Sequence, residues 1–242
     1  MHVLIVYAHP EPTSFNAALK DAAIETIGAA GHNVEVSDLY AEGFNPVAGR
    51  HDFSTVADQQ RFHYQSEQLL AARSDGFSDE LKREQNRLLG ADIVILQFPL
   101  WWGGPPAILK GWFDRVLAYG FAYAEGRRYD QGLFKGRYGI ICVTTGGTEQ
   151  RFSKDGEYGD IERVLWPVRR LALEYLGLVV EDPTVCYATP RVDEATRADY
   201  ILAWKARISD TLARAEQHQI HREPLTSAAE LGSGSANWTS RG

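Results

Sequence analysis

Apolar runs of strand length recur along the chain and are separated by segments with a helical pattern. Five strands are expected, at residues 2–8, 34–38, 91–98, 138–144 and 179–187. Most of these runs are continuously apolar, which is typical of strands buried on both faces of a parallel sheet. Residues 34–38 instead alternate between apolar and polar, and Pro183 interrupts the last run.

Between the strands, apolar residues recur every three or four positions. Helices are expected from about residue 17 to 27, 78 to 89, 161 to 175 and 193 to 218, and after two prolines at 105 and 106 that suit a first helical turn. Thr13 or Ser14 would cap the first helix. Because strands and helices alternate five times, the sequence predicts an α/β fold: a doubly wound five-stranded parallel sheet with helices on both faces.

Two stretches depart from this alternation. Residues 39–78 form a long excursion with some helix after Ser66, and loops of this length usually have a function or a layer of their own. Residues 222–242 are rich in Ser, Gly and Ala, and are interpreted as a tail. The expected organisation is one domain over residues 1–221, followed by this tail.

Composition excludes several classes of protein. The net charge is −7 with both signs interleaved, which argues against a nucleic-acid-binding surface. No apolar run approaches the roughly 20 residues of a membrane span, and no signal peptide is recognised, so no membrane insertion is expected. Cys142 and Cys186 each lie in a strand-like run. They favour free thiols and a cytoplasmic location, although a disulfide stays possible. No metal site is expected.

Three loops should meet at one edge of the sheet, because parallel strands all end on the same side. Residues 9–16 offer hydroxyls and free amides at a helix N-terminus, which suits an anion, although Thr13 and Ser14 could serve only as caps. Residues 99–104 offer two tryptophans and two glycines, and residues 144–147 two threonines and two glycines. A flavin nucleotide fits such an edge. The chain has neither GxGxxG after its first strand nor a GxxxxGK[ST] motif.

Several motifs together resemble the FAD-dependent NAD(P)H:quinone reductase (DT-diaphorase) family. They are His9–Asn16, Ser37–Tyr40, Phe44–Pro46, Phe98–Gly103, Pro106–Phe113, Phe121–Tyr123, Thr144–Gly147 and Leu165–Pro167, in the family's order and with similar spacing. The resemblance spans roughly residues 3 to 212. It implies a flavodoxin-like fold and a homodimer with each flavin site at the subunit interface. It also implies ping-pong hydride transfer from NAD(P)H through FAD to a small quinone, with FMN less expected.

The resemblance also assigns roles to individual residues. Those implied to bind the cofactor are His9, Thr13, Ser14, Phe15, Asn16, Pro99, Leu100, Trp101, Trp102, Gly103, Thr144, Thr145, Gly146, Gly147 and Arg197. Those implied to line the substrate side are Tyr123, Glu125, Trp102, Phe152 and Tyr158, and those placed at the reaction centre are Tyr158, Phe152 and Gly147. His63 stands where the family contacts FAD with an amide side chain.

Two positions depart from the family. After Thr-Thr-Gly-Gly, the family typically places a tyrosine and, six residues on, a histidine, which are credited with stabilising the flavin charge. This chain has Phe152 and Tyr158 there. Phe152 cannot donate a hydrogen bond, and a tyrosine with an ordinary pKa of about 10 is a poor proton shuttle. Either residue could simply pack over the ring.

Two other functions share the fold and several motifs. One is a flavin-bound regulatory subunit of a potassium efflux system, in which a weak proton relay would be tolerable. The other is an NAD(P)H-dependent reductase of a different acceptor, such as an azo dye, a nitroaromatic or free flavin. The sequence does not decide between NADH and NADPH.

Overall fold

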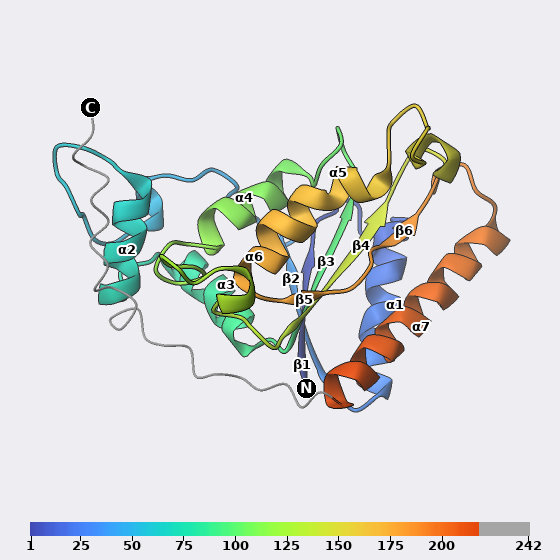
Figure 1. The fold of residues 1–242 in the computed structure, drawn as a ribbon, viewed down its shortest axis with the longest axis horizontal. Helices are drawn as coiled ribbons and strands as arrows, with labels where there is room; N and C mark the ends of the chain where they lie inside the picture. Colours follow the sequence, from blue (N-terminus) through green and yellow to red (C-terminus); the bar gives the residue numbers. More distant parts are fainter. Residues whose placement is uncertain (218–242) are drawn as a thin grey trace.

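A parallel sheet forms the centre of the protein (Figure 1). The computed structural model describes residues 1–217, so the tail expected at 222–242 lies outside the described residues. The strands are β1 (His2–Tyr7), β2 (Asn33–Asp38), β3 (Ile93–Pro99), β4 (Tyr138–Thr144), β5 (Val179–Val180) and β6 (Thr184–Cys186). Their order is β2-β1-β3-β4-β5, with β6 also paired to β4, and every pairing is parallel.

The predicted α/β fold is confirmed, and the expected fifth strand forms as two short pieces. Both pieces lie along β4, where Tyr138 pairs with Val179 and Cys142 pairs with Thr184. Pro183 lies between them and has no amide proton to donate, so it cannot take part in a continuous ladder.

Helices cover both faces of the sheet, as predicted. In Figure 1, α1 (Phe15–Ala29) and α7 (Glu194–Gln217) lie against one face. On the other face lie α3 (Asp79–Gly90), α4 (Ala107–Val116), α5 (Ile161–Val168), a π-helical turn (Arg169–Leu173) and α6 (Glu174–Leu176). Alternate residues of β1 enter the two cores: Val3 and Ile5 face α1 and α7, whereas Leu4 and Val6 face the other layer.

Helix boundaries differ from the sequence prediction at three places. Pro105 and Pro106 precede α4 instead of occupying its first turn, because the backbone at Pro106 is extended (ψ 150°). The helix in the excursion, α2 (Tyr64–Ser74), begins two residues before Ser66 and is capped by His63. The helix expected over 161–175 is present but irregular, with the π-helical turn just after Pro167, whose nitrogen has no proton to donate.

The excursion of residues 39–78 is fastened to α4 by a buried cluster of charged groups. Arg115 donates from Nε and Nη2 to Oδ1 of Asp52 at 2.9 and 2.6 Å, and both side chains are almost fully buried. Nη1 of Arg115 also donates to Glu80 at 2.5 Å, and the Tyr64 hydroxyl donates to Oδ2 of Asp52 at 2.5 Å. A short 3-10 helix, Arg50–Asp52, places the aspartate. α2 therefore lies outside the two helix layers, at one end of the molecule (Figure 1).

Both cysteines are buried free thiols, as the sequence favoured. Burial raises the pKa of Cys142 and raises that of Cys186 to about 12, so both are protonated at neutral pH and poorly nucleophilic. Across residues 1–217, no helix is both long and apolar enough to span a bilayer, and no cluster of side chains could hold a metal ion.

Candidate flavin site

The structure brings three loops together at the carboxyl edge of the sheet. We call them the edge loops: residues 9–16 after β1, 99–104 after β3, and 144–147 after β4. The amide of Leu100 donates to the carbonyl of Thr144 at 2.8 Å, and Asn16 Nδ2 donates to Thr144 Oγ1 at 2.7 Å. The side chain of Gln97, at the end of β3, donates to the carbonyl of Asn16 at 2.5 Å. Hydrogen bonds between neighbouring strand ends thus fix the three loops relative to one another.

The first edge loop holds an anionic oxygen supplied by the chain itself. Ser14 is the N-cap of α1, and its Oγ accepts from the amide of Ala17 at 3.1 Å. The Glu11 carboxylate accepts from the amide and hydroxyl of Thr13, at 2.9 and 2.6 Å, and these hydrogen bonds lower the pKa of Glu11. The loop can therefore bind a negatively charged oxygen. The sequence analysis did not single out Glu11, although an acid three residues before the N-cap Ser14 is a usable signal.

The second edge loop is a tight turn that exposes its tryptophan. Trp101 and Gly104 exchange backbone hydrogen bonds of 3.0 Å, and the two residues between them, Trp102 and Gly103, have φ of 50° and 74°. A non-glycine residue in this region costs free energy, and such strain often occurs at functional sites. The Trp102 side chain is fully exposed, whereas Trp101 lies beside His9 with ring centroids 6.4 Å apart.

The side chains of Phe152 and Tyr158, which stand where the family has a tyrosine and a histidine, cover the third edge loop. Thr145 donates from its amide to Cys186 and from its hydroxyl to the carbonyl of Gly147. The rings of Phe152 and Tyr158, 5.2 Å apart, pack on Gly147 so closely that a Cβ there would lie 2.8 Å from one and 2.9 Å from the other. Any side chain at 147 would therefore force at least one of these rings to move.

Phe152 and Tyr158 differ in how far they reach solvent. Phe152 is 8% exposed and Tyr158 is 46% exposed. The Tyr158 hydroxyl accepts a hydrogen bond of 3.2 Å from Arg151, which the sequence analysis did not single out. The ring of Phe152 lies 6.2 Å from that of Tyr187, which directly follows β6. The edge therefore carries one packed aromatic ring and one accessible hydroxyl.

Several buried polar atoms of the predicted cofactor residues have no partner within residues 1–217. They include Asn16 Oδ1 and Arg197 Nε, and Oε1 of the neighbouring Gln97. Arg197, near the start of α7, donates its Nη2 to the carbonyl of Thr189, whose amide in turn donates to Thr145. Unpaired buried groups are costly. The two unused acceptors would fit hydroxyl or N–H donors of a cofactor, and the cationic Arg197 would fit its anionic part, as in a flavin nucleotide.

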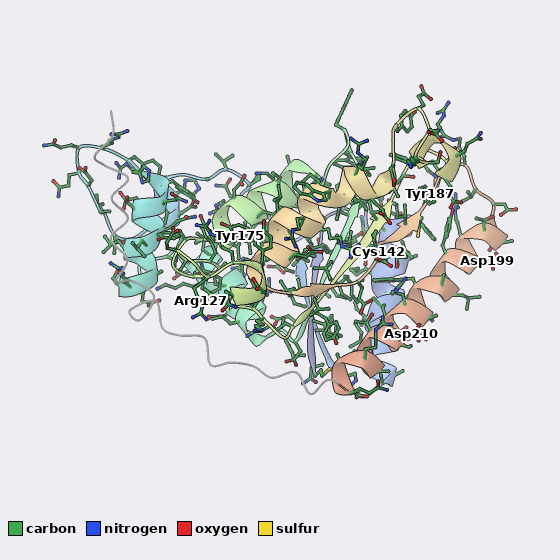
Figure 2. The ribbon with its side chains drawn as sticks, viewed as in Figure 1. Arg127, Cys142, Tyr175, Tyr187, Asp199 and Asp210 are labelled. Atoms are coloured by element: carbon green, nitrogen blue, oxygen red, sulfur yellow. The ribbon has the colours of Figure 1, made fainter. Side chains whose placement is uncertain are left out.

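The remaining predicted site residues lie elsewhere on the same chain. Tyr123 and Glu125 line a cavity of about 330 Å³, and His63 at the cap of α2 lines it too. The Tyr123 hydroxyl accepts from Gln65, and its ring lies 5.5 Å from that of Tyr175. Figure 2 shows Tyr175 well separated from Tyr187, which marks the edge. Within one chain, the residues predicted for the substrate side therefore fall into two groups.

Known proteins resemble this chain over most of its length. A family model described as flavodoxin-like fold matches residues 1–208. NAD(P)H dehydrogenase (quinone) 1 of Rattus norvegicus is 42% identical over 206 residues, which are 85% of this chain and 75% of that protein. Ribosyldihydronicotinamide dehydrogenase (quinone) of Homo sapiens is 41% identical over 207 residues, 85% of this chain and 90% of that protein. The crystal structure of a putative quinone reductase from Klebsiella pneumoniae, 40% identical, superposes with a TM-score of 0.83 and covers 88% of this chain and 85% of that one.

Proposed function

Because this chain belongs to the flavodoxin-like family of NAD(P)H dehydrogenases (quinone), we propose that it is an enzyme that reduces quinones with NAD(P)H through a bound flavin. The observation that carries the proposal is the meeting of the three edge loops. They combine a loop that holds an anionic oxygen, an exposed aromatic turn, and a glycine loop covered by a tyrosine. These are the surfaces that the phosphate and the ring of a flavin need.

A bound flavin would supply the redox chemistry, which is the transfer of two electrons from NAD(P)H to the quinone. The chain's own residues bind, orient and stabilise charge. The amide and hydroxyl of Thr13 would hold phosphate oxygens in place of Glu11. Gly146 and Gly147 would let the backbone approach the ring closely, and the Tyr158 hydroxyl would donate toward it.

The experiment that tests this proposal is steady-state oxidation of NADH and NADPH by purified protein with a simple benzoquinone. We expect turnover that depends on the flavin. A flavin-bound protein that does not reduce the quinone would favour the regulatory subunit instead. Faster turnover of azo, nitro or flavin acceptors would favour a reductase of another class.

FAD rather than FMN is the expected cofactor. Support comes from His9 on the first edge loop and from Arg197, whose buried Nε has no partner within residues 1–217. Both suit a dinucleotide, which extends beyond the ring and one phosphate. The absorbance spectrum of purified protein and chromatography of the released flavin test this expectation, and released FMN would overturn it.

A homodimer with its site between the chains explains why the predicted substrate residues are divided. Tyr123 and Glu125 would then complete the edge of a partner. Tyr123 also lines an apolar cavity of about 470 Å³ between α4 and the helix around Pro167, together with the exposed Leu171, and the neighbouring Trp166 is exposed as well. Apolar surface of this kind is typically covered by a partner. Light scattering at micromolar concentration should give a dimeric mass. An active, flavin-loaded monomer would contradict the proposal.

The state of the two cysteines is informative about the cellular compartment in which the protein works. Cys142 and Cys186 are both reduced and buried within strands. Proteins of oxidising compartments commonly use their cysteines in disulfides, so we propose that the chain works in the cytoplasm.

A further inference from the structure

Arg151 contacts the residue that stands where a histidine is expected. Its Nη1 donates to the Tyr158 hydroxyl at 3.2 Å, and its guanidinium carbon lies 5.5 Å from the centre of the Tyr158 ring. The 3-10 helix η3 (Glu149–Phe152) places Arg151 immediately before Phe152, which packs on the same glycine as Tyr158. The amide of Tyr158 also donates to the carbonyl of Arg151 at 2.9 Å. Arg151 and Tyr158 are therefore held together by backbone as well as by side chains.

This contact determines what the Tyr158 hydroxyl can do. A tyrosine hydroxyl has one proton to donate, and it also accepts. Because Arg151 fills an acceptor position with a charged donor, the hydroxyl proton stays available for another group, and the hydroxyl is polarised in the direction that strengthens its donation. The ring is fixed against Gly147, in the loop proposed to hold the flavin ring.

We propose that Arg151 is a positioning residue that acts through Tyr158, so that the two together replace the histidine at this edge. The inference rests on the proposed function. A hydride brings negative charge to the bound flavin, and a polarised hydroxyl backed by a permanent cation stabilises that charge. Arginine keeps its charge at every working pH, whereas a histidine would lose it near neutrality.

Glu157 partly offsets the positive charge of Arg151. Its removal therefore tests the proposal with an expected change in the opposite direction. Its carboxylate lies 3.3 Å from Nε of Arg151, and both side chains are at least half exposed. Exposed pairs of this kind are weak, so the guanidinium charge is only partly offset. Removing the carboxylate should therefore have a small effect opposite to that of removing the arginine.

The test is the two-electron reduction potential of the flavin bound to the full-length protein, measured by equilibration with a redox dye. We expect Arg151→Met to lower the equilibrium constant for reduction about three- to tenfold, a fall of about 15 to 30 mV for a two-electron couple. Arg151→Lys should recover part of the loss, and Glu157→Gln should raise the potential slightly. Lys154→Met is the matched control, because it removes one positive charge from an exposed position on the same loop.

A double-mutant cycle tests whether Arg151 acts through Tyr158. In a Tyr158→Phe background, Arg151→Met should change the potential by less than half of its effect in the parent. An equal change in potential in both backgrounds would overturn the proposed route through Tyr158. An equal fall in potential in Lys154→Met would also overturn it, because the loss of any nearby positive charge would then explain the effect. Flavin that binds and turns over with an unchanged potential in Arg151→Met would overturn the inference and leave the proposed function standing. A protein that binds no flavin would fail the proposed function itself.

Discussion

The edge loops and the excursion of residues 39–78 are held in place in different ways. The edge loops follow buried strands, and both main-chain and side-chain hydrogen bonds join neighbouring strand ends, such as those from Leu100 and Asn16 to Thr144. The excursion has no strand beneath it, and it is fastened by side chains, above all Arg115 with Asp52. A loop that directly follows a strand is held in place by the hydrogen bonds between that strand and its neighbours. A segment fastened by a few buried charges depends on each of them.

The largest expected effect is the loss of this fastening. Arg115→Met leaves the Asp52 carboxylate buried without its cation, which should lower the free energy of unfolding by about 3–5 kcal/mol. Urea denaturation of the flavin-free protein measures this loss. Lys110→Met on the same helix is the matched control, because its pair with Asp114 is about half exposed and should contribute at most about 0.5 kcal/mol. Similar losses in both variants would mean that the excursion is held by something other than the buried ion pair.

At the edge loops, the largest effect should be on rate. Each well-placed donor stabilises developing charge by roughly 2–4 kcal/mol, and Tyr158 is the donor that remains of the expected pair. Tyr158→Phe should therefore slow flavin reduction more than tenfold, since about 1.4 kcal/mol is a factor of ten. Anaerobic stopped-flow mixing with NADPH measures this step alone. Reduction at the parental rate would make Tyr158 a packing residue and move the donor to a backbone amide of residues 144–147.

A smaller effect concerns the packing over the third edge loop. Gly147→Ala places a methyl group against two aromatic rings, and overpacking of this kind costs about 1–3 kcal/mol. Gly146→Ala is the matched control, since a Cβ at 146 meets no atom within 4 Å. Thermal unfolding of the two flavin-free variants should separate them, with Gly147→Ala the less stable. Equal stability would mean that Phe152 and Tyr158 move aside without cost.

The smallest effect is a gain. Phe152→Tyr or Tyr158→His introduces a donor of the type that the family resemblance leads one to expect. Either change should raise the rate of flavin reduction by a few-fold in the same stopped-flow experiment, because part of the charge stabilisation is already supplied. Slower flavin reduction in both variants would show that Phe152 and Tyr158 support this step better than the family's residues do in this chain.

The same contrast explains what the sequence could predict. The parallel strands and the edge loops follow from apolar runs and from the rule that parallel strands end together, both local signals. The Asp52–Arg115 pair joins residues 63 positions apart in the chain, and no periodicity indicates it. Glu11 and Arg151 were missed for a related reason. Their roles depend on where a carboxylate or a guanidinium points, which spacing does not give.

Subunit complementation tests whether the two groups of predicted substrate residues meet across a dimer interface. Ser14→Asp keeps a good N-cap but repels a phosphate, which disables the edge loops, and Tyr123→Ala disables the second group. If each site uses the edge of one chain and Tyr123 of the other, half of the dimers in an equal mixture are hybrids with one intact site. Quinone turnover should then recover to about a quarter of the parental value. Turnover that stays at the mean of the two variants would contradict a shared site and place the whole site within one chain.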